Sequence, residues 1–292
     1  LRGLRVRLQK NNKLMSQVSF SLISWNVAGR VKNCSQQLKT ILESEPDVLA
    51  LQEIRKNSLK IWQKGLEQAG YNIKETATSA EAHNRRLGVL IASKFEIKEL
   101  SYEIEIPFPE RFLGAQISSP AGKIKLYNCH IPPGSSNGWK KIETFEGVFQ
   151  LLANNSRELR ILCGDFNSPQ TELADGTIVT WGQKIKSDGS IVLKNKYKRW
   201  DKGERDVIEK LGEYDLVDVY RVLHGYKKQA FSWYLKRKGE VVAKRRFDHI
   251  FASHRLNPVS CYYIHKTRLD GLSDHSSIRA RFEPEKIDNF RN

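Results

Sequence analysis

Several short apolar runs of the sequence end in polar residues of the kinds that catalyse reactions or bind metals. SLISW is followed by Asn26, DVLALQ by Glu53 and KIKLYNC by His130. The other residues of this kind beside apolar runs are Asp165, Asn167, Asp248, Asp274 and His275. A single carboxylate after a strand is usually a turn or helix-cap residue. Because side chains at the ends of neighbouring strands can meet in one cleft, their recurrence here indicates a shared site.

Four of these residues suit a hard metal ion and a water nucleophile. Mg²⁺ prefers carboxylate and amide oxygens and keeps several waters, which Glu53 and Asn26 could provide for. Asp165 and Asn167 are two positions apart on an extended segment, so both can face one cleft. Hydrolysis of a phosphodiester needs an oriented water and neutralised phosphate oxygens, and this set of residues fits that reaction.

The two histidines suit contacts with a phosphate. His130 and His275 can donate to phosphate oxygens or transfer protons near neutral pH. Asp274 or Asp248 could orient a histidine, because a carboxylate that accepts from one ring nitrogen fixes the direction of the other.

The elements between these residues predict one α/β or α+β domain with helices packed over sheets. The patterns predict strands at 18–25, 47–52, 71–78, 87–93, 112–118, 123–129, 159–164, 231–235, 245–253 and 276–282. They predict helices at 33–44, 58–69, 140–154 and 204–223, and short β-like pieces within 171–203. No repeat or linker divides the chain, so we expect a single domain over 15–285 followed by a tail, 286–292.

The first 14 residues are basic and carry no acid. Met15 is the only methionine and directly precedes a strand pattern, so we expect the domain to begin there. Residues 1–14 are then either upstream sequence or a genuine basic arm. They lack the apolar core of a secretory signal, and no apolar run approaches the ~18 residues of a membrane helix. We therefore expect a cytoplasmic protein, or a nuclear one in a eukaryote, with no membrane partner.

Four cysteines occur, and no two have the CxxC spacing of a zinc site. Cys129 and Cys163 lie in apolar strand patterns and are predicted to be buried free thiols. A reducing compartment suits them, although four cysteines could also form two disulfides.

The charge of the chain predicts an anionic partner. The 292 residues carry a net charge of +16 with a pI near 9.6, which favours nucleic acid first and an acidic membrane second. Lysines and arginines cluster within 177–200 and 221–246, with aromatic residues among them, as suits phosphate contacts and base stacking. The alternative is a solvated basic surface. Candidate contacts are Arg55, Asn137, Trp139, Trp181, Lys194, Lys196, Lys198, Arg199, Trp200, Arg237, Lys238 and Arg245. Trp233 alternates within a strand pattern and is interpreted as a core residue.

The ordered motifs resemble the endonuclease/exonuclease/phosphatase superfamily, which includes deoxyribonuclease I and exonuclease III. They are Trp25-Asn26-Val27, Leu51-Gln52-Glu53, Gly164-Asp165-Phe166-Asn167, Phe247-Asp248-His249-Ile250 and Ser273-Asp274-His275, within a resemblance over 18–283. The resemblance implies an α/β sandwich of two packed, mainly antiparallel sheets flanked by helices in four layers.

The resemblance also implies a role for each candidate residue. Asn26 and Glu53 would hold Mg²⁺, for which Mn²⁺ could substitute, with Asp274 near the metal or near a histidine pair. Asp165 would activate or position the attacking water, with help from Asn167. His130 and His275 would contact the scissile phosphate, and Asp248 would orient a histidine. The identity of the general base stays open.

Four positions depart from the apurinic endonucleases of that superfamily. Ala28 stands where they carry an aspartate near the metal, and His130 stands where they carry a tyrosine. Of Ser232, Arg245 and Phe247, which fall near their abasic-sugar pocket, only Phe247 is bulky and apolar. The chain therefore resembles a dedicated apurinic endonuclease less closely than the ordered motifs first suggest, and His130 is closer to the deoxyribonuclease and lipid-phosphatase branches.

The leading hypothesis is a metal-dependent nuclease, with DNA favoured over RNA, that works as a monomer without an obligate protein partner. One alternative is a phospholipid or phosphoinositide phosphoesterase of the same fold, which needs an exposed apolar surface for the bilayer. A second alternative is a nucleic-acid-binding protein with little or no catalysis.

Overall fold

The structure is a computed structural model that describes residues 19–78 and 87–284. The predicted basic extension 1–14 and tail 286–292 lie outside the described residues, as do both ends of the predicted domain, 15–18 and 285. Within the described part of the chain, no helix is both long enough and apolar enough to cross a membrane.

Two six-stranded sheets form the centre of the molecule. In spatial order, the first contains β17 (Pro258–Ile264), β18 (Ser277–Phe282), β1 (Phe20–Asn26), β2 (Val48–Arg55), β4 (Leu87–Ser93) and β3 (Asn72–Glu75). The second contains β13 (Val217–Asp218), β16 (Asp248–Ala252), β8 (Leu159–Asp165), β7 (Gly122–His130), β6 (Phe112–Ser119) and β5 (Ile97–Glu99). Among the strands that the structure describes, only β1–β2 and β7–β8 are parallel pairs, so the sheets are mainly antiparallel, as predicted.

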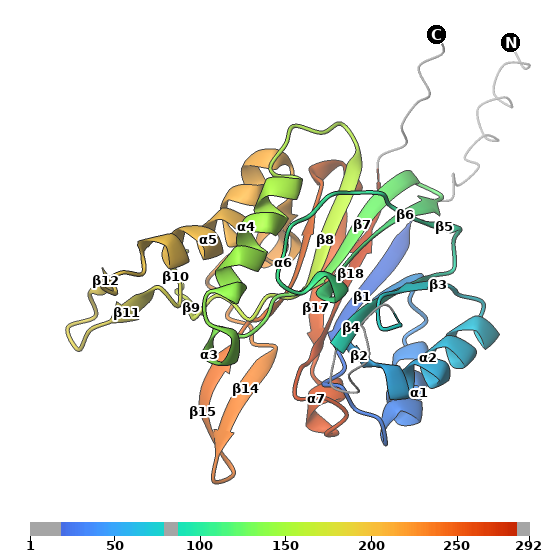
Figure 1. The fold of residues 1–292 in the computed structure, drawn as a ribbon, viewed down its shortest axis with the longest axis horizontal. Helices are drawn as coiled ribbons and strands as arrows, with labels where there is room; N and C mark the ends of the chain where they lie inside the picture. Colours follow the sequence, from blue (N-terminus) through green and yellow to red (C-terminus); the bar gives the residue numbers. More distant parts are fainter. Residues whose placement is uncertain (1–18, 79–86, 285–292) are drawn as a thin grey trace, which may run out of the picture.

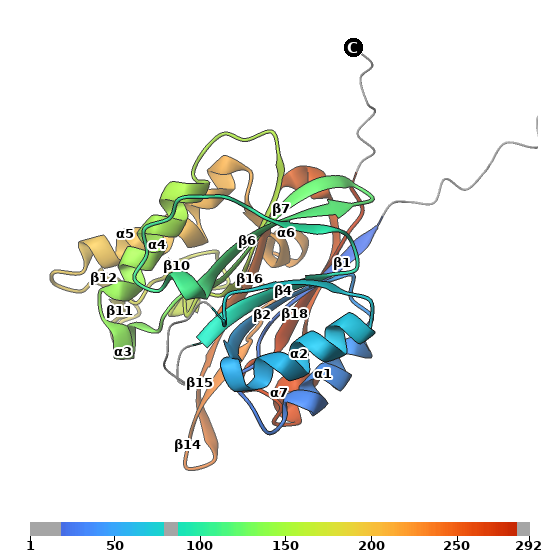
Figure 2. The same ribbon diagram turned by 45° about the vertical axis from the view of Figure 1, so that its right-hand side comes forward.

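The sheets pack face to face around one apolar core, and helices cover their outer faces. Leu22 and Val89 of the first sheet and Leu126 and Ile161 of the second belong to this central core. Helices α1 (Cys34–Leu42) and α2 (Lys56–Gln68) pack on the first sheet, and α4 (Lys140–Leu152) and α5 (Lys198–Ile208) on the second. Figures 1 and 2 show the two helical layers on opposite sides. The predicted four-layer α/β sandwich is confirmed.

The predicted helix 204–223 is wrong. The structure has α5, a 3₁₀ turn over Lys210–Tyr214, β13 and then α6 (Val219–His224) in this region. Asp215 adopts a left-handed conformation, with φ of 60°, which ends the turn. Asp218 then caps α6, because its carboxylate accepts from the backbone N–H of Arg221. The helical spacing of apolar residues continues across this break, so periodicity alone did not reveal it.

Two further predictions of elements need correction. The predicted strand 245–253 is divided between β15 (Glu240–Arg245) and β16, and β15 pairs with β14 (Trp233–Arg237) in a hairpin that projects from the body (Figure 1). Strand β17 was not predicted, because it begins at a proline on the sheet edge and mixes apolar with polar residues.

The remaining short elements lie around the second sheet and near β18. They are α3 (Gly134–Asn137), β9 (Thr171–Glu172), β10 (Ile178–Val179), β11 (Gln183–Ile185), β12 (Ile191–Leu193), α7 (Lys266–Leu269) and two 3₁₀ turns, Pro109–Arg111 and His254–Leu256. The strands among them confirm the short β-like pieces predicted within 171–203. All four cysteines are buried and free, so the prediction of buried thiols is confirmed and the disulfide alternative is wrong.

Candidate active site

The strand topology brings the candidate catalytic and metal-binding residues to one edge of the two sheets. The parallel pairs place the ends of their strands side by side, with Asn26 beside Gln52 and His130 beside Asp165. Strand β16 runs antiparallel to β8, so its first residue, Asp248, pairs with Asp165 at the end of β8. Strand β18 likewise runs antiparallel to β1, which brings the segment before it to the same edge.

Asp165 lies at the centre of the group and is almost completely buried. Its Oδ1 accepts from the backbone N–H of Asn167 at 2.9 Å, and its Oδ2 accepts from Nδ2 of Asn26 at 2.9 Å. Burial raises the pKa of Asp165 to about 7, although His275 lowers it. The preceding residue must be glycine: a Cβ at Gly164 would lie 1.8 Å from the carbonyl oxygen of Cys129.

Glu53 reaches the site from an irregularity in β2. The pairing of β2 with β4 shifts between Leu51 and Ile54, and Glu53 has a left-handed backbone with φ of 61°. Its Oε1 accepts from Nδ2 of Asn26 at 3.1 Å, so one amide group bonds both carboxylates. Oδ1 of Asn26 accepts from the backbone N–H of Ala28 at 2.8 Å, which fixes the orientation of this amide.

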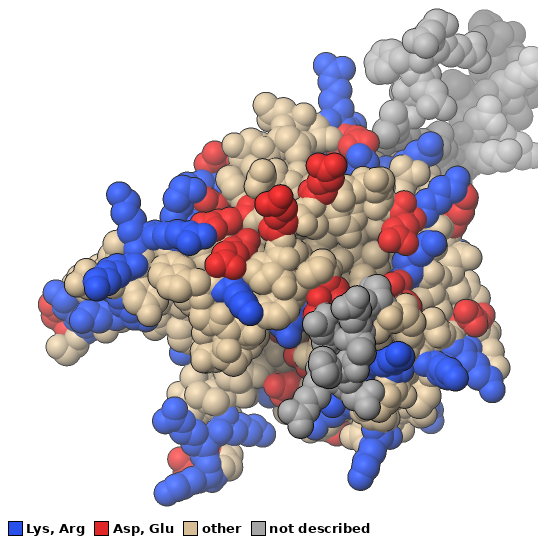
Figure 3. Space-filling model, in the orientation of Figure 1, with Lys and Arg blue, Asp and Glu red and all other residues tan. Residues whose placement is uncertain are grey.

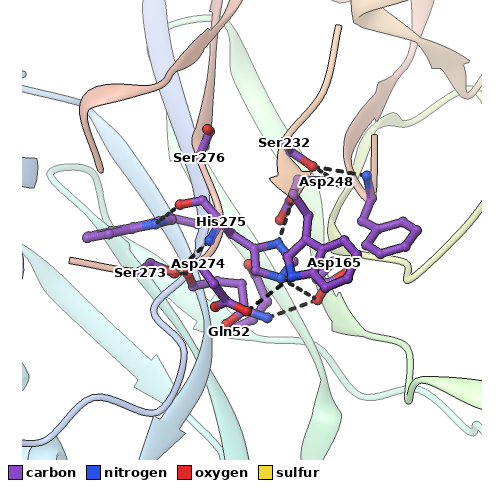
Figure 4. A network of polar contacts seen from close by, with 12 residues as sticks. Gln52, Asp165, Ser232, Asp248, Ser273, Asp274, His275 and Ser276 are labelled. Atoms are coloured by element: carbon purple, nitrogen blue, oxygen red, sulfur yellow. Dashed lines mark hydrogen bonds and ion pairs between the residues drawn. The ribbon is translucent and has the colours of Figure 1, made fainter. Parts of the chain in front are cut away.

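His275 stands between two carboxylates (Figure 4). Its Nδ1 bonds Asp248 at 2.8 Å, and its Nε2 lies 3.7 Å from Oδ2 of Asp165. Burial alone would lower the pKa of His275, but the charges of Asp248 and Asp165 raise it to about 10. The imidazolium form is therefore favoured, with its Nε2–H toward Asp165. Ser232 holds Asp248 in place, because its hydroxyl accepts from the backbone N–H of Asp248 at 3.2 Å.

His130 contributes a second, buried imidazole. Its Nε2 lies 3.6 Å from Oε1 of Glu53 and 3.9 Å from Oδ2 of Asp165. Burial lowers the pKa of His130 well below its usual range, and the guanidinium of Arg111 lowers it further. The neutral imidazole is therefore favoured, in contrast to His275.

The residues present fit a divalent metal. Ligand atoms of Glu53, His130 and Asp165 lie within 4.8 Å of one another, as do those of Asp165, Asp248 and His275. Two carboxylates and a neutral imidazole are ordinary ligands for such ions. His275 is occupied by its carboxylate partners, so the first group is the better metal site.

Asp274 and Trp233 lie at the exposed side of this centre. Oδ2 of Asp274 accepts from Nε1 of Trp233 at 3.1 Å, and Asp274 does not belong to either group of close ligand atoms among the described residues. Trp233 is half-buried and lines a pocket beside the site. The interpretation of Trp233 as a core residue is therefore wrong: its strand belongs to the projecting hairpin and not to either large sheet.

The predicted nucleic-acid contacts are spread over several elements. Four of them, Trp181, Lys194, Trp200 and Arg245, line the pocket beside Asn167, although Trp200 is largely buried. Trp139, Lys196, Lys198 and Arg199 lie on the surface that adjoins it, and Asn137 ends α3. Arg237 and Lys238 lie at the tip of the hairpin, and Arg55 ends β2. Lys and Arg side chains gather on the hairpin and on the β11–β12 arm (Figure 3).

Sequence reasoning missed three groups that support the site. Arg111 is half-buried, and its charge acts on Glu53 and Asp165. Lys141 is buried and donates to the carbonyl oxygen of Asn167 at 2.8 Å. The sequence did carry a signal for Lys141, because a lysine within the apolar face of a helix indicates a buried charge. Arg111 has no such signal, because it lies in a loop-like stretch.

The third group is a pair of buried amides beneath Glu53. Nε2 of Gln52 donates to Oδ1 of Asn128 at 2.7 Å across the two sheets. Nδ2 of Asn128 donates to the carbonyl oxygens of Leu51 and Leu90, both at 3.0 Å, where the β2–β4 ladder is interrupted. Asn128 of the second sheet therefore donates hydrogen bonds to carbonyl oxygens of β2 and β4 at the point where the pairing of these strands is interrupted.

Replacement of Asn128 tests whether this pair positions Glu53. Asn128→Leu should weaken binding of Mn²⁺ or Mg²⁺ by about 10- to 100-fold, the usual cost of losing support for a ligand. It should also lower stability by about 1–3 kcal/mol, because buried partners lose their bonds. Calorimetric metal titration and thermal unfolding would measure both. Asn72→Leu is the control. Asn72 lies in β3, at the edge of the first sheet, and its side chain donates to the backbone carbonyl oxygens of Ser93 and Phe95. Unchanged metal affinity in Asn128→Leu would contradict the positioning role.

A model of the endonuclease/exonuclease/phosphatase family matches residues 23–275. This chain belongs to that family. The match includes every candidate site residue from Asn26 to His275, so the whole candidate site lies within the family region.

Known proteins of similar sequence and fold span almost the whole chain. The chain is 24% identical to exodeoxyribonuclease III of Haemophilus influenzae, over 89% of this chain and 99% of that protein. An AP endonuclease from Archaeoglobus fulgidus has a TM-score of 0.66 at 22% identity, covering 90% of this chain and 99% of that one. The 3′ phosphatase NExo from Neisseria, bound to a product DNA hairpin, has a TM-score of 0.66 at 19% identity, with the same coverage. At these identities the structural likeness shows the fold.

Proposed function

We propose that this member of the family is a metal-dependent phosphodiesterase that cleaves nucleic acid, with DNA favoured. The observation that carries the proposal is the position of Asp165. Its carboxylate lies between a neutral histidine beside Glu53 and a charged His275–Asp248 pair. Such a centre can accept a proton on one side and stabilise a phosphate on the other.

Each residue then has a proposed role. Asp165 takes the proton of the attacking water, and Asn167 holds the carboxylate through its backbone N–H. The imidazolium of His275 donates to a phosphate oxygen and is oriented by Asp248. His130 lies close enough to the same centre to contact the phosphate.

A divalent ion, for which Mg²⁺ is proposed and Mn²⁺ could substitute, would be held by Glu53 with Asp165 or His130. Asn26 turns its Nδ2 and not its Oδ1 toward these carboxylates, so its proposed role is to hold Glu53 and Asp165 in place. When bound, it would neutralise phosphate oxygens and lower the pKa of a bound water. Asp274 is proposed to act from the exposed side of this site through its charge on Glu53 and His275.

The relatives and the surface favour a nucleic acid substrate. The sequence relative is named an exodeoxyribonuclease, and one structural relative was solved with a DNA hairpin. Basic and aromatic side chains surround the pocket beside Asn167, as suits phosphate and base contacts. The exposed large apolar residues are distributed over several elements, which does not favour the lipid alternative.

A cleavage assay tests this function directly. Pure protein would be incubated with labelled duplex DNA, duplex DNA with one abasic site, single-stranded DNA and single-stranded RNA, each with Mg²⁺ or with EDTA. We expect cleavage of at least one DNA substrate with Mg²⁺ and none with EDTA. Failure of folded protein to cleave any of them would overturn the proposal and direct attention to lipid or small phosphoesters.

The salt dependence of binding tests the basic surface. Arg199 is paired with Glu146, with Nη2 to Oε2 at 2.7 Å, so the exposed Lys196 and Lys198 should contribute more to the response. Changing both lysines to Ser should reduce the slope of log K against log salt by up to about 1.8 on duplex DNA. The slope would be measured by fluorescence anisotropy at several salt concentrations.

The matched control for this experiment is the pair Lys60→Ser and Lys64→Ser on α2. These lysines are also exposed, but they lie on the helical layer opposite α5 (Figure 1). An equal fall of the slope in both double variants would mean that Lys196 and Lys198 have no special role.

A further inference from the structure

An aromatic pocket of about 420 Å³ opens beside the catalytic centre. It begins at Asn167, whose backbone N–H bonds Asp165. Its walls carry the rings of Trp181, Tyr197, Trp200, Trp233 and Phe247. Its volume falls within the range of about 300–1,000 Å³ typical of small-molecule sites. Lys194 and Arg245 also line it and give it positive charge.

The indole rings of this pocket are fixed by the protein itself. Nε1 of Trp181 donates to the carbonyl oxygen of Asn167 at 3.0 Å, and Nε1 of Trp200 donates to Glu204 at 2.8 Å. Trp233 is held in the same way by Asp274 and stacks on Phe247, with 5.3 Å between ring centroids. Because every indole N–H has a partner, ring surface and not hydrogen bonding is what these side chains offer to a ligand.

The aromatic surface continues outside the pocket. Trp139 is 41% exposed and stacks on Tyr197, with 6.0 Å between centroids and 27° between ring planes. Tyr197 is 37% exposed and also lines the pocket, so it joins the two surfaces. Lys196 and Lys198 flank Tyr197 in the sequence and are exposed. An exposed pair of stacked rings between cations fits an anionic ligand with flat faces.

We propose that the pocket and the Trp139–Tyr197 surface bind unpaired bases next to the scissile phosphate. The preferred substrate is therefore a single strand or a frayed end that retains its bases. Inside a duplex both faces of each base are covered by its neighbours, so unpaired bases offer far more ring surface for stacking than a duplex does. A base in the pocket beside Asn167 leaves its backbone next to Asp165. This inference rests on the proposed function and adds the class of substrate.

The test compares single-stranded DNA with blunt duplex DNA of the same sequence. Trp139→Ala and Tyr197→Ala should each weaken single-strand binding by about 5- to 150-fold, the effect of one lost base stack. Ala243 lies in β15 and lines the pocket, so Ala243→Trp should reduce the space for a base and weaken single-strand binding by a similar factor. Blunt duplex binding should change by less than about twofold. Tyr262→Ala is the control, because Tyr262 is 47% exposed on β17, in the other sheet.

A single strand in which the bases are replaced by abasic residues provides a second comparison. It should bind the wild-type protein more weakly, and Trp139→Ala should weaken its binding no further, since the stack is already lost. The inference would be overturned if Trp139→Ala weakened the binding of intact and abasic single strands equally. It would also be overturned if the variant weakened the binding of single strand and duplex equally. Wild-type cleavage with Mg²⁺ in that case leaves the proposed function standing. Absence of both cleavage and binding in the wild type would overturn the function itself.

Discussion

Asp165→Asn should lower turnover at least about a thousandfold while leaving the fold intact. The amide keeps the size of the carboxylate but cannot take a proton, and general base catalysis contributes about 10²- to 10⁴-fold. It also removes the negative charge that faces Nε2 of His275. Single-turnover cleavage with Mg²⁺ would measure the loss, and circular dichroism would confirm the fold.

The stability of this variant provides an independent check. Burial raises the pKa of Asp165 from 3.8 to about 7, so its ionised form is less stable in the folded state than in the unfolded chain. That penalty develops as pH rises from about 4 to about 7, and a neutral amide avoids it. Without divalent metal, Asp165→Asn should therefore melt at the same temperature as the wild type or higher at pH 7.

The control is Asp175→Asn, the same change at an exposed turn where the carboxylate accepts from the backbone N–H of Thr177. It should leave turnover unchanged. A well-folded Asp165→Asn protein with near wild-type turnover would remove Asp165 from the mechanism.

Glu53→Gln should strongly reduce metal-dependent cleavage while nucleic acid is still bound. Glu53 supplies a carboxylate that is only partly buried and lies beside His130 and Asn26. The amide lacks the charge that a divalent cation requires, and metal assistance provides several kcal/mol of transition-state stabilisation. We expect a loss of about a hundredfold or more in turnover, and metal binding too weak to detect by calorimetry.

Gel retardation would show whether binding survives in Glu53→Gln, because the basic surface is unchanged. Glu67→Gln, on the exposed face of α2, is the matched control. Retention of tight metal binding and activity by Glu53→Gln would place the ion elsewhere. Loss of both cleavage and nucleic acid binding would show that Glu53 supports the substrate surface or the fold.

The sequence by itself determined the sandwich fold and predicted the main members of the proposed active site. Strands such as β1, β2 and β8 are mostly apolar and show no strict alternation with polar residues, because both their faces are buried. Asn26, Glu53 and Asp165 end or follow such runs, so their place at a sheet edge is a local property. The order of motifs then supplied the resemblance to the family.

Only the tertiary structure decided how these groups face one another and what surrounds them. Beside the left-handed turn at Glu53, Asn128 of the opposite sheet bonds the carbonyl oxygen of Leu51, and the opposite charge states of His130 and His275 depend on burial and neighbours. Trp233 has the alternation of a core strand, yet it belongs to a projecting hairpin and lines a pocket. The spacing of apolar residues along the chain indicates which side chains are buried. The neighbours of each side chain, whether a strand, a charged group or an aromatic ring, depend on how distant segments pair in the fold.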